Sequence, residues 1–384
     1  MKINSNCNFN YKVQNSGLSQ QSFRGYDARQ LKAVVMTVCD DPNAFDVVKQ
    51  VSQIGKKDGF EVYFAHSSNK IYRSLNAIKK FFTEKYGGYC KWAQDVFCVT
   101  PNDTVVSSHF PADEELAVLT SKFLNKKYQK LNDIVEGGNK FFVKNGDKQE
   151  LLLGSNEKSL GDVDFLKKMY GVSDVHFIPQ ADYHLDLFIR PLKNKQVLVA
   201  DDKLMIKELK NALSNIEKCK KSLSDTKEIQ KLEETKKEIE KVLKDFKNEV
   251  KISQNPTADE VSESLQKAGY EPIRVPGRLY YVIPNKGADD LVSQLNYLNA
   301  VVHEKSDGTL TFITNKSALN EKCNITPEIS EKIGFDFEKV FVKYLKPYVK
   351  ADDVHFISGK ENYIAKVLEN QSGGIHCLCT EIPQ

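Results

Sequence analysis

The sequence predicts a mixed α/β fold that contains several strand hairpins. From Leu31 onward, short apolar segments alternate with amphipathic segments, which is the pattern of an α/β domain. The turn Asn145-Gly146-Asp147 separates two apolar segments, and Asp307-Gly308 separates two others. Both are strong hairpin signals, and hairpins join antiparallel strands. The sheets are therefore not expected to be purely parallel.

Apolar runs and glycine stops define the elements of the first half. Gly59 closes one amphipathic segment, and Gly87-Gly88 closes the next. The expected helices are Ala44–Gly59 and Asn69–Tyr86, and the expected strands are Leu31–Val38, Phe60–Ala65, Val96–Thr100, Thr104–Ser107, Phe141–Val143 and Leu151–Gly154.

The second half continues the same alternation. Its strands are rich in β-branched and aromatic residues and are bounded by turn residues. The expected strands are Val175–Ile178, Leu185–Ile189, Gln196–Val199, Tyr280–Ile283, Ala300–Glu304, Thr309–Thr314, Val354–Ile357 and Ile375–Thr380.

Residues 203–252 differ from the rest of the chain. They contain no Gly or Pro, and their apolar residues recur at spacings of three and four. Asp225 and Glu228 have the spacing of a capping box between two helices. We expect a helical hairpin inserted into the α/β domain, with an apolar stripe that the two helices bury against each other. A lid or partner-docking arm is one interpretation, but the balanced charges favour a solvated accessory insertion.

Composition excludes several classes of protein. The chain has 384 residues and a formal net charge of +3, which gives no strong attraction to nucleic acid or membrane surfaces. No apolar run is long enough to cross a membrane. The polar segment 1–28 is expected to be a disordered leader, and 29–384 a single domain. Neither a Walker loop nor a GxGxxG motif is present, which argues against nucleotide chemistry.

The eight cysteines are scattered and form no CxxC pair. This distribution predicts free thiols in a reducing, cytoplasmic setting. Two of them, Cys377 and Cys379, follow Gly373-Gly374 near the end of the chain. If 375–380 is extended, both thiols face one side and His376 faces the other, which makes His376 a poor base for Cys377. Inert packing of the thiols and a metal site with His376 are the alternatives.

His184 and Asp186 are the candidate partners of that thiol. At strand spacing i, i+2 they would share one face, opposite Leu185 and Leu187. A cysteine, a histidine and an aspartate far apart in sequence are the usual components of thiol covalent catalysis. Two polar residues on the solvent face of an edge strand would give the same pattern.

Five motifs together resemble a known family. They are Trp92-Ala93-Gln94-Asp95, VEGGN at 135–139, HLD at 184–186 followed by RPL, YLN at 297–299 and GGIHC at 373–377. Their order and spacing resemble the guanidino-group-modifying (pentein) superfamily, most closely agmatine deiminases and peptidylarginine deiminases. The resemblance implies an α/β propeller of five pseudo-repeated ββαβ units, with the helical hairpin as an insertion.

The resemblance also implies roles for single residues. Cys377 matches the nucleophile and His184 the general acid/base, while Asp95 and Asp186 match the carboxylates that hold the guanidinium. Trp92, Glu136 and Asn299 match residues beside the substrate. A planar guanidinium presents paired donors that carboxylates accept, which suits these assignments.

The implied activity is hydrolytic deimination of agmatine or of an arginine derivative, free or peptidyl. It proceeds through a cysteine thiouronium intermediate without metal or organic cofactor, and for agmatine it belongs to putrescine and polyamine biosynthesis. The partner is a small guanidino compound or an arginine side chain, with no nucleic acid or membrane; a homo-oligomer stays open. The alternatives are an amidinotransferase, which passes the amidino group to an amine, and a catalytically inactive binding or scaffold protein.

Overall fold

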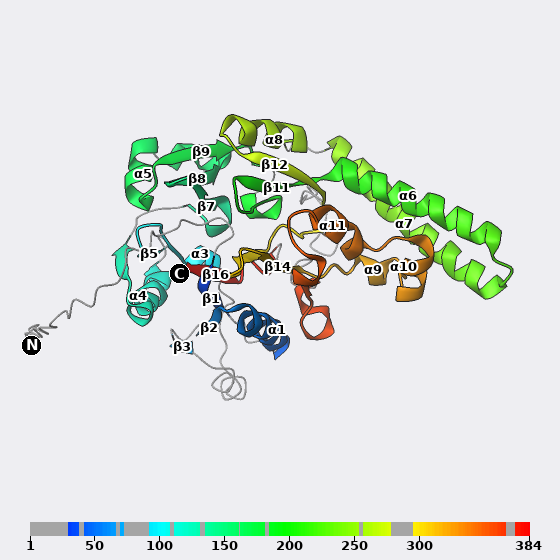
Figure 1. Cartoon of the computed structure of the whole chain (residues 1–384), viewed down its shortest axis with the longest axis horizontal. Helices are drawn as coiled ribbons and strands as arrows, with labels where there is room; N and C mark the ends of the chain where they lie inside the picture. The colour runs from blue at the N-terminus through cyan, green and yellow to red at the C-terminus, as the bar shows by residue number, and fades with distance from the viewer. Residues whose placement is uncertain are drawn as a thin grey trace, which may run out of the picture.

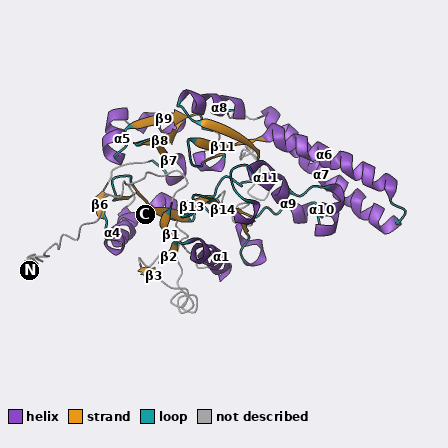
Figure 2. Ribbon diagram, in the orientation of Figure 1, coloured by secondary structure: helices purple, strands orange, loops and turns teal. Residues whose placement is uncertain are grey.

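The described part of the chain forms a mixed α/β fold, which confirms the predicted class (Figures 1 and 2). The expected leader 1–28, the expected strand 280–283 and most of the expected helix 69–86 lie outside the described residues. The computed structural model describes residues 30–37, 42–66, 70–72, 92–107, 111–130, 135–160, 162–180, 184–252, 256–277, 295–365 and 373–384.

The described strands form five sheets that share one plan. In each sheet a central strand pairs antiparallel with one neighbour and parallel with the other. The sets, each with its central strand in the middle, are β16 (Cys379–Pro383), β1 (Leu31–Thr37) and β2 (Glu61–His66); β4 (Phe97–Val99), β5 (Thr104–Ser107) and β6 (Lys127–Lys130); β7 (Lys140–Asn145), β8 (Lys148–Gly154) and β9 (Asp174–Ile178); β10 (Ile189–Pro191), β11 (Gln196–Asp201) and β12 (Glu271–Pro276); β13 (Val301–Glu304), β14 (Leu310–Asn315) and β15 (Val354–Ile357). A further strand, β3 (Lys70–Tyr72), pairs antiparallel with β2, so the described part of the expected helix 69–86 is a strand and that prediction is wrong there.

Helices supply the crossovers that parallel strands need. Each lies between the central strand of a sheet and its parallel neighbour. They are α1 (Pro42–Asp58), α4 (Pro111–Leu124), α5 (Val163–Tyr170), the group α6 (Asp202–Ser222), α7 (Thr226–Ile252) and α8 (Ala258–Lys267), and the group α9 (Leu319–Lys322), α10 (Pro327–Ile333) and α11 (Phe337–Leu345). The described helices include none with the length and apolar character that crossing a bilayer requires.

The two ends of the described chain are joined in one sheet. β1 pairs antiparallel with β16, from Leu31 opposite Pro383 to Met36 opposite Cys379. This pairing ties down the C-terminal segment, whose strand begins two residues after Cys377. The segment that carries the candidate nucleophile is therefore part of the core and not a free tail.

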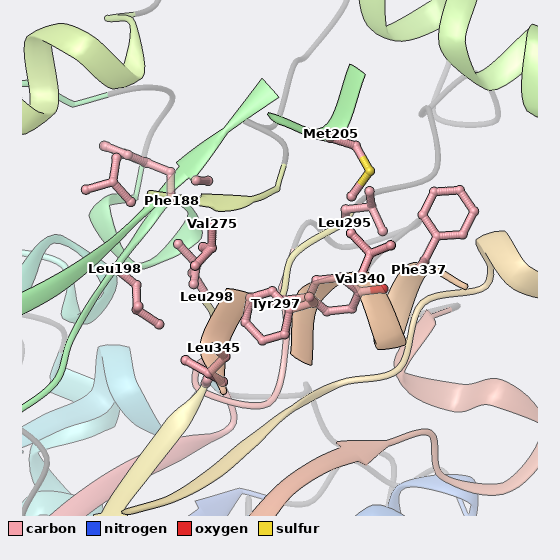
Figure 3. Packing of buried hydrophobic residues seen from close by; sticks show 14 of the residues in the cluster. Phe188, Leu198, Met205, Val275, Leu295, Tyr297, Leu298, Phe337, Val340 and Leu345 are labelled. Atoms are coloured by element: carbon pink, nitrogen blue, oxygen red, sulfur yellow. The ribbon is translucent and has the colours of Figure 1, made fainter. Parts of the chain in front are cut away.

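Helices α6 and α7 lie within the predicted hairpin 203–252 and extend away from the sheets (Figure 1). Their apolar stripe is not self-contained, however. Met205, Leu209 and Ile216 are fully buried in the same cluster as Phe337 and residues of the β11 sheet. Figure 3 shows Met205 beside Leu295, close to side chains of α11.

Polar contacts also attach the hairpin to the β14 sheet's helices. Asn215 Nδ2 donates to the carbonyl of Ile333 at 3.0 Å, and Lys332 pairs with Glu228 at 2.8 Å. The expectation that the two helices bury their apolar stripe only against each other is therefore wrong. The stripe is wide enough to pack on its partner helix and on the domain together.

Two expected strands begin later than predicted. Leu185–Leu187 is a 3-10 turn, η3, and β10 starts only at Ile189. Residues 375–378 form a turn, and β16 starts at Cys379. Both turns carry candidate site residues, so their side chains do not follow the alternation of a strand.

Candidate active site

Each of the five sheets begins after a short turn that contributes one chemically important side chain. Asp95 lies in α3 (Ala93–Val96) before β4, and Glu136 precedes η1 (Gly137–Asn139) and β7. Asp186 lies in η3 before β10, Asn299 precedes β13, and Cys377 precedes β16. The five positions are equivalent in the repeated plan. We call these residues, together with His184, the entry-turn cluster.

The reactive atoms of Cys377, His184 and Asp186 lie together in the interior. One ligand-type atom of each lies within 4.8 Å of the other two, and all three residues are buried. Cys377 Sγ is 3.9 Å from Asp186 Oδ2. Segments separated by about half the chain therefore meet as a thiol, an imidazole and a carboxylate, the combination that nucleophilic catalysis requires.

Asn299 connects the thiol and the carboxylate. Its Nδ2 donates to Asp186 Oδ2 at 2.8 Å and to Cys377 Sγ at 3.1 Å. Its Oδ1 accepts from the backbone N–H groups of His376 and Cys377, at 2.9 and 3.4 Å. The whole amide is used by the protein, so Asn299 orients the cluster. The predicted contact of Asn299 with substrate is not what this geometry favours.

Two glycines permit the close approach of these groups. A Cβ on Gly374 would lie 2.5 Å from Asn299 Oδ1, and a Cβ on Gly138 would lie 2.4 Å from His184 Nδ1 and 3.0 Å from Asp186 Oδ1. Cβ atoms do not approach other atoms this closely, so any side chain would displace the cluster. The glycines of both GG motifs are thus explained by close packing.

His184 is held by a carboxylate. Its Nε2 lies 2.7 Å from Glu136 Oε2, whose side chain is 58% exposed. Burial disfavours charge on the imidazole, but the hydrogen bond to Glu136 and the nearby Asp186 and Asp95 outweigh burial and raise the pKa of His184. The hydrogen bond to His184 in turn lowers the pKa of Glu136. These contacts shift His184 toward the imidazolium form, which a general acid requires.

Asp95 is the third carboxylate at the site. Its Oδ1 accepts from the backbone N–H of Gly137 at 3.0 Å. Burial raises its pKa, and the charges of Asp186 and Glu136 raise it further against the opposing effect of His184. Acidic groups that are held close together and desolvated attract a cation.

The surroundings of the candidate nucleophile disfavour its thiolate form. Burial raises the pKa of Cys377 well above its ordinary value, and Asp186 and Asp95 raise it further. A cation placed between these carboxylates would offset their charge and favour deprotonation of the thiol. The site thus has a reason to activate its thiol only when a cation is bound.

The remaining predicted residues lie around this cluster. Trp92 is half-buried, and a Cβ on Gly373 would lie 2.5 Å from its ring, so the indole covers the approach to the nucleophile turn. His376 does not face away from the site as predicted for an extended segment. Because 375–378 is a turn, its Nδ1 lies 2.7 Å from Asp186 Oδ2. Sequence reasoning missed this contact because it assumed a strand.

The cluster also has the composition of a cation-binding site. His184, Asp186 and Cys377 form the one group among the described residues whose atoms are close enough to hold a metal ion. Asp186 Oδ1 accepts no hydrogen bond from any described residue although it is fully buried. An organic cation with N–H donors would satisfy that oxygen directly.

Comparison with solved structures gives the fold. An agmatine deiminase from C. jejuni matches with a TM-score of 0.52 and 14% sequence identity, over 96% of this chain and 99% of that chain. The chain has the pentein fold. The cysteine-to-serine variant of the same enzyme with substrate bound matches over the same shares of the two chains, with a TM-score of 0.50 and 14% identity. An arginine dihydrolase from cyanobacteria gives 0.40 at 13% identity, over 92% of this chain and 39% of that chain.

In comparisons of sequence, no protein-family model and no curated protein matches the chain. In a pentein fold of such divergent sequence, the evidence for a site is its geometry. The five entry turns bring a thiol, an imidazole, an amide and carboxylates to one place.

Proposed function

We propose that this chain is a hydrolase that deiminates a guanidino compound, with Cys377 as nucleophile. The five sheets would be the blades of one propeller, with the entry turns at its axis. The observation that carries the proposal is the close group formed by Cys377, His184 and Asp186, with Asp95 and Glu136 beside it. The fold shared with an agmatine deiminase supports it.

The substrate would bind as a cation. Asp186 Oδ1 and the carboxylate of Asp95 would accept N–H groups of the guanidinium, which fixes its central carbon near Cys377. The bound charge would offset the two carboxylates, which add to the effect of burial in raising the pKa of the thiol. Substrate binding and thiol activation would thus be coupled.

In the first half-reaction the Cys377 thiolate forms a C–S bond to the guanidinium carbon. The C–N bond to the terminal nitrogen then breaks, and His184 gives its proton to that nitrogen, which leaves as ammonia. A thiouronium group remains attached to Cys377. The raised pKa of His184 suits this role, because it favours the protonated imidazole that donates to the leaving nitrogen.

In the second half-reaction water attacks the thiouronium carbon and His184 takes a proton from the water. The C–S bond breaks, the thiolate returns, and the substrate leaves as a ureido product. The remaining proton converts ammonia to ammonium, so atoms and charges balance. Neither a metal nor an organic cofactor takes part, and a cytoplasmic setting suits a free thiol.

Substrate identity is open among agmatine, arginine, methylated arginines and peptidyl arginine. The test is to incubate the purified protein with each compound and measure ureido product and ammonia, with Cys377→Ser as control. We expect both products from one class of compound without any added amine. Turnover that requires an acceptor amine would identify an amidinotransferase, and binding without turnover would identify an inactive member of the fold.

A further inference from the structure

Asp186 is fully buried, and one of its two oxygens is already occupied. Oδ2 receives hydrogen bonds from Asn299 Nδ2 at 2.8 Å and from His376 Nδ1 at 2.7 Å. A carboxylate oxygen has two lone pairs, so these two nitrogen donors saturate Oδ2, which the Cys377 thiol also approaches, at 3.9 Å. Oδ1, in contrast, accepts from no described residue and lies over Gly138 beside His184.

We propose that His376 is a positioning residue that fixes Asp186, so that the carboxylate presents only Oδ1 to the substrate. The proposal rests on the proposed function for its consequence in catalysis, but its geometry does not depend on turnover. A guanidinium held by Asp186 would then donate a single hydrogen bond to it, in place of the paired bonds that carboxylates commonly accept. The second anionic contact must come from another group, and Asp95 is the carboxylate placed to provide it.

The proposal specifies which nitrogen of His376 carries a proton. An anionic Asp186 at 2.7 Å from Nδ1 requires a proton on that nitrogen. Gln94 also approaches Nδ1 with its amide at 2.7 Å, and its Oε1 has no described donor. Rotating the amide by half a turn brings Oε1 to the same proton and removes a contact between two donors. His376 therefore donates through Nδ1, toward Asp186 and Gln94.

An ion pair also holds the same two segments together. Arg190, four residues after Asp186, donates from Nη2 to Glu381 Oε1 at 2.5 Å. Glu381 lies five residues after His376, and its Oε1 is 3.9 Å from Nε2 of His376. The segment that carries Asp186 and the segment that carries Cys377 are thus linked by two contacts, His376 with Asp186 and Arg190 with Glu381.

Ring stacking restricts the imidazole further. Phe141 stacks on His376, with centroids 5.8 Å apart and planes inclined by 18°, and Arg190 covers Phe141 at 5.3 Å. The ring is therefore fixed in the orientation that aims Nδ1 at Asp186. His376 is also absent from the close group of reactive atoms, which contains His184 instead. These contacts favour positioning over proton transfer to substrate.

Two variants of His376 separate positioning from packing. In His376→Asn the amide nitrogen can occupy the place of Nδ1 and still donate to Asp186, whereas His376→Leu has similar bulk and no donor. We expect His376→Leu to raise KM for the best substrate by about tenfold to a hundredfold, the effect of losing a hydrogen bond to a charged group, and His376→Asn to raise it by no more than about threefold. Cys98→Ala serves as control, because Cys98 lines the same small cavity as His376 and is not a member of the entry-turn cluster.

A spectroscopic measurement tests the geometry without any substrate. In ¹⁵N NMR of histidine-labelled wild-type protein, with the His376 signal assigned through His376→Asn, Nδ1 should show the shift of a protonated nitrogen. A lone pair at Nδ1 would overturn the proposal, as would equal KM values for the Leu and Asn variants. If no guanidino compound is turned over, the proposed function fails, and the NMR result alone still decides the role of His376.

Discussion

The entry-turn cluster and the outer surface of the α6–α7 hairpin both pair acidic with basic side chains, but in opposite environments. At the site, Asp186 is fully buried and each of its contacts is specific. On the hairpin, Lys236 lies 2.9 Å from Glu217 and 3.8 Å from Glu240, both in solvent. Exposed pairs contribute little, whereas a buried charge that loses its partner is costly. The same kind of pairing therefore fixes side chains in the buried cluster and contributes little to stability on the hairpin surface.

The largest effect is expected at the nucleophile. Cys377→Ser should reduce turnover by roughly a thousandfold or more, since the alcohol is far harder to ionise than the thiol in this site. Cys379→Ser should keep most of the activity. Cys379 is buried like Cys377, and burial raises its pKa as well, so it is a matched control for the loss of a buried thiol. Steady-state rates of both variants check this. Comparable losses would mean that Cys377 has no special role.

The next effect concerns the two carboxylates. Asp186→Asn and Asp95→Asn keep the size of the side chain but remove the charge that faces the guanidinium. We expect kcat/KM to fall about a hundredfold to a thousandfold, which corresponds to a loss of several kcal/mol in transition-state stabilisation. Asp174→Asn, a largely exposed carboxylate on β9, is the control. Near-normal efficiency in either site variant would refute its role in binding.

The next prediction concerns the α6–α7 hairpin and compares its buried face with its exposed face. Ile216 is fully buried between the hairpin and the domain, so Ile216→Ala should destabilise the protein by about 2–4 kcal/mol. Lys236→Ala, on the exposed face, should leave stability unchanged within error. Urea unfolding of both variants measures the difference. If Ile216→Ala were neutral, the hairpin would be the independent arm that its sequence suggested.

The smallest effect is a shift with pH. Glu136→Gln removes the charge that raises the pKa of His184, so the alkaline limb of kcat/KM, where His184 loses its proton, should move to lower pH. Stability follows the same sign. A histidine with a raised folded pKa stabilises the protein below its unfolded pKa of about 6.5, and this is lost as pH rises through the folded value.

The stability difference between wild type and Glu136→Gln should therefore be larger at pH 6 than at pH 9. It should stay below about 1 kcal/mol because Glu136 is more than half exposed and solvent screens its charge. Rate profiles and unfolding curves at the two pH values check both statements. An unchanged alkaline limb would separate Glu136 from the titration of His184.

Local patterns predicted the regular elements well. The turn Asn145-Gly146-Asp147 joins β7 and β8 as expected, and the apolar spacing of 203–252 corresponds to α6 and α7. The turns at 185–187 and 375–378 were not predicted, because three or four residues contain too little periodicity to distinguish a turn from a strand. Errors at such boundaries are small in length but change where a side chain points.

The residues of the candidate site could be selected from the sequence, but the contacts between them could not. Cys377, His184 and Asp186 were selected by residue type and by family resemblance, and the structure brings them together. The bond between Glu136 and His184 spans 48 residues, and that between His376 and Asp186 spans 190. The spacing of residues along the sequence does not predict contacts between segments that are so far apart. The apolar face shared by hairpin and domain was missed for the same reason.

Covalent labelling by a haloacetamidine tests the central claim most directly, because this amidine resembles a guanidinium and places a reactive carbon beside the nucleophile. The account predicts one label per chain, located on Cys377 by peptide mapping, with activity lost in proportion and with protection by the best substrate. Labelling of Cys379 in its place, or loss of activity while Cys377 stays unmodified, would contradict it.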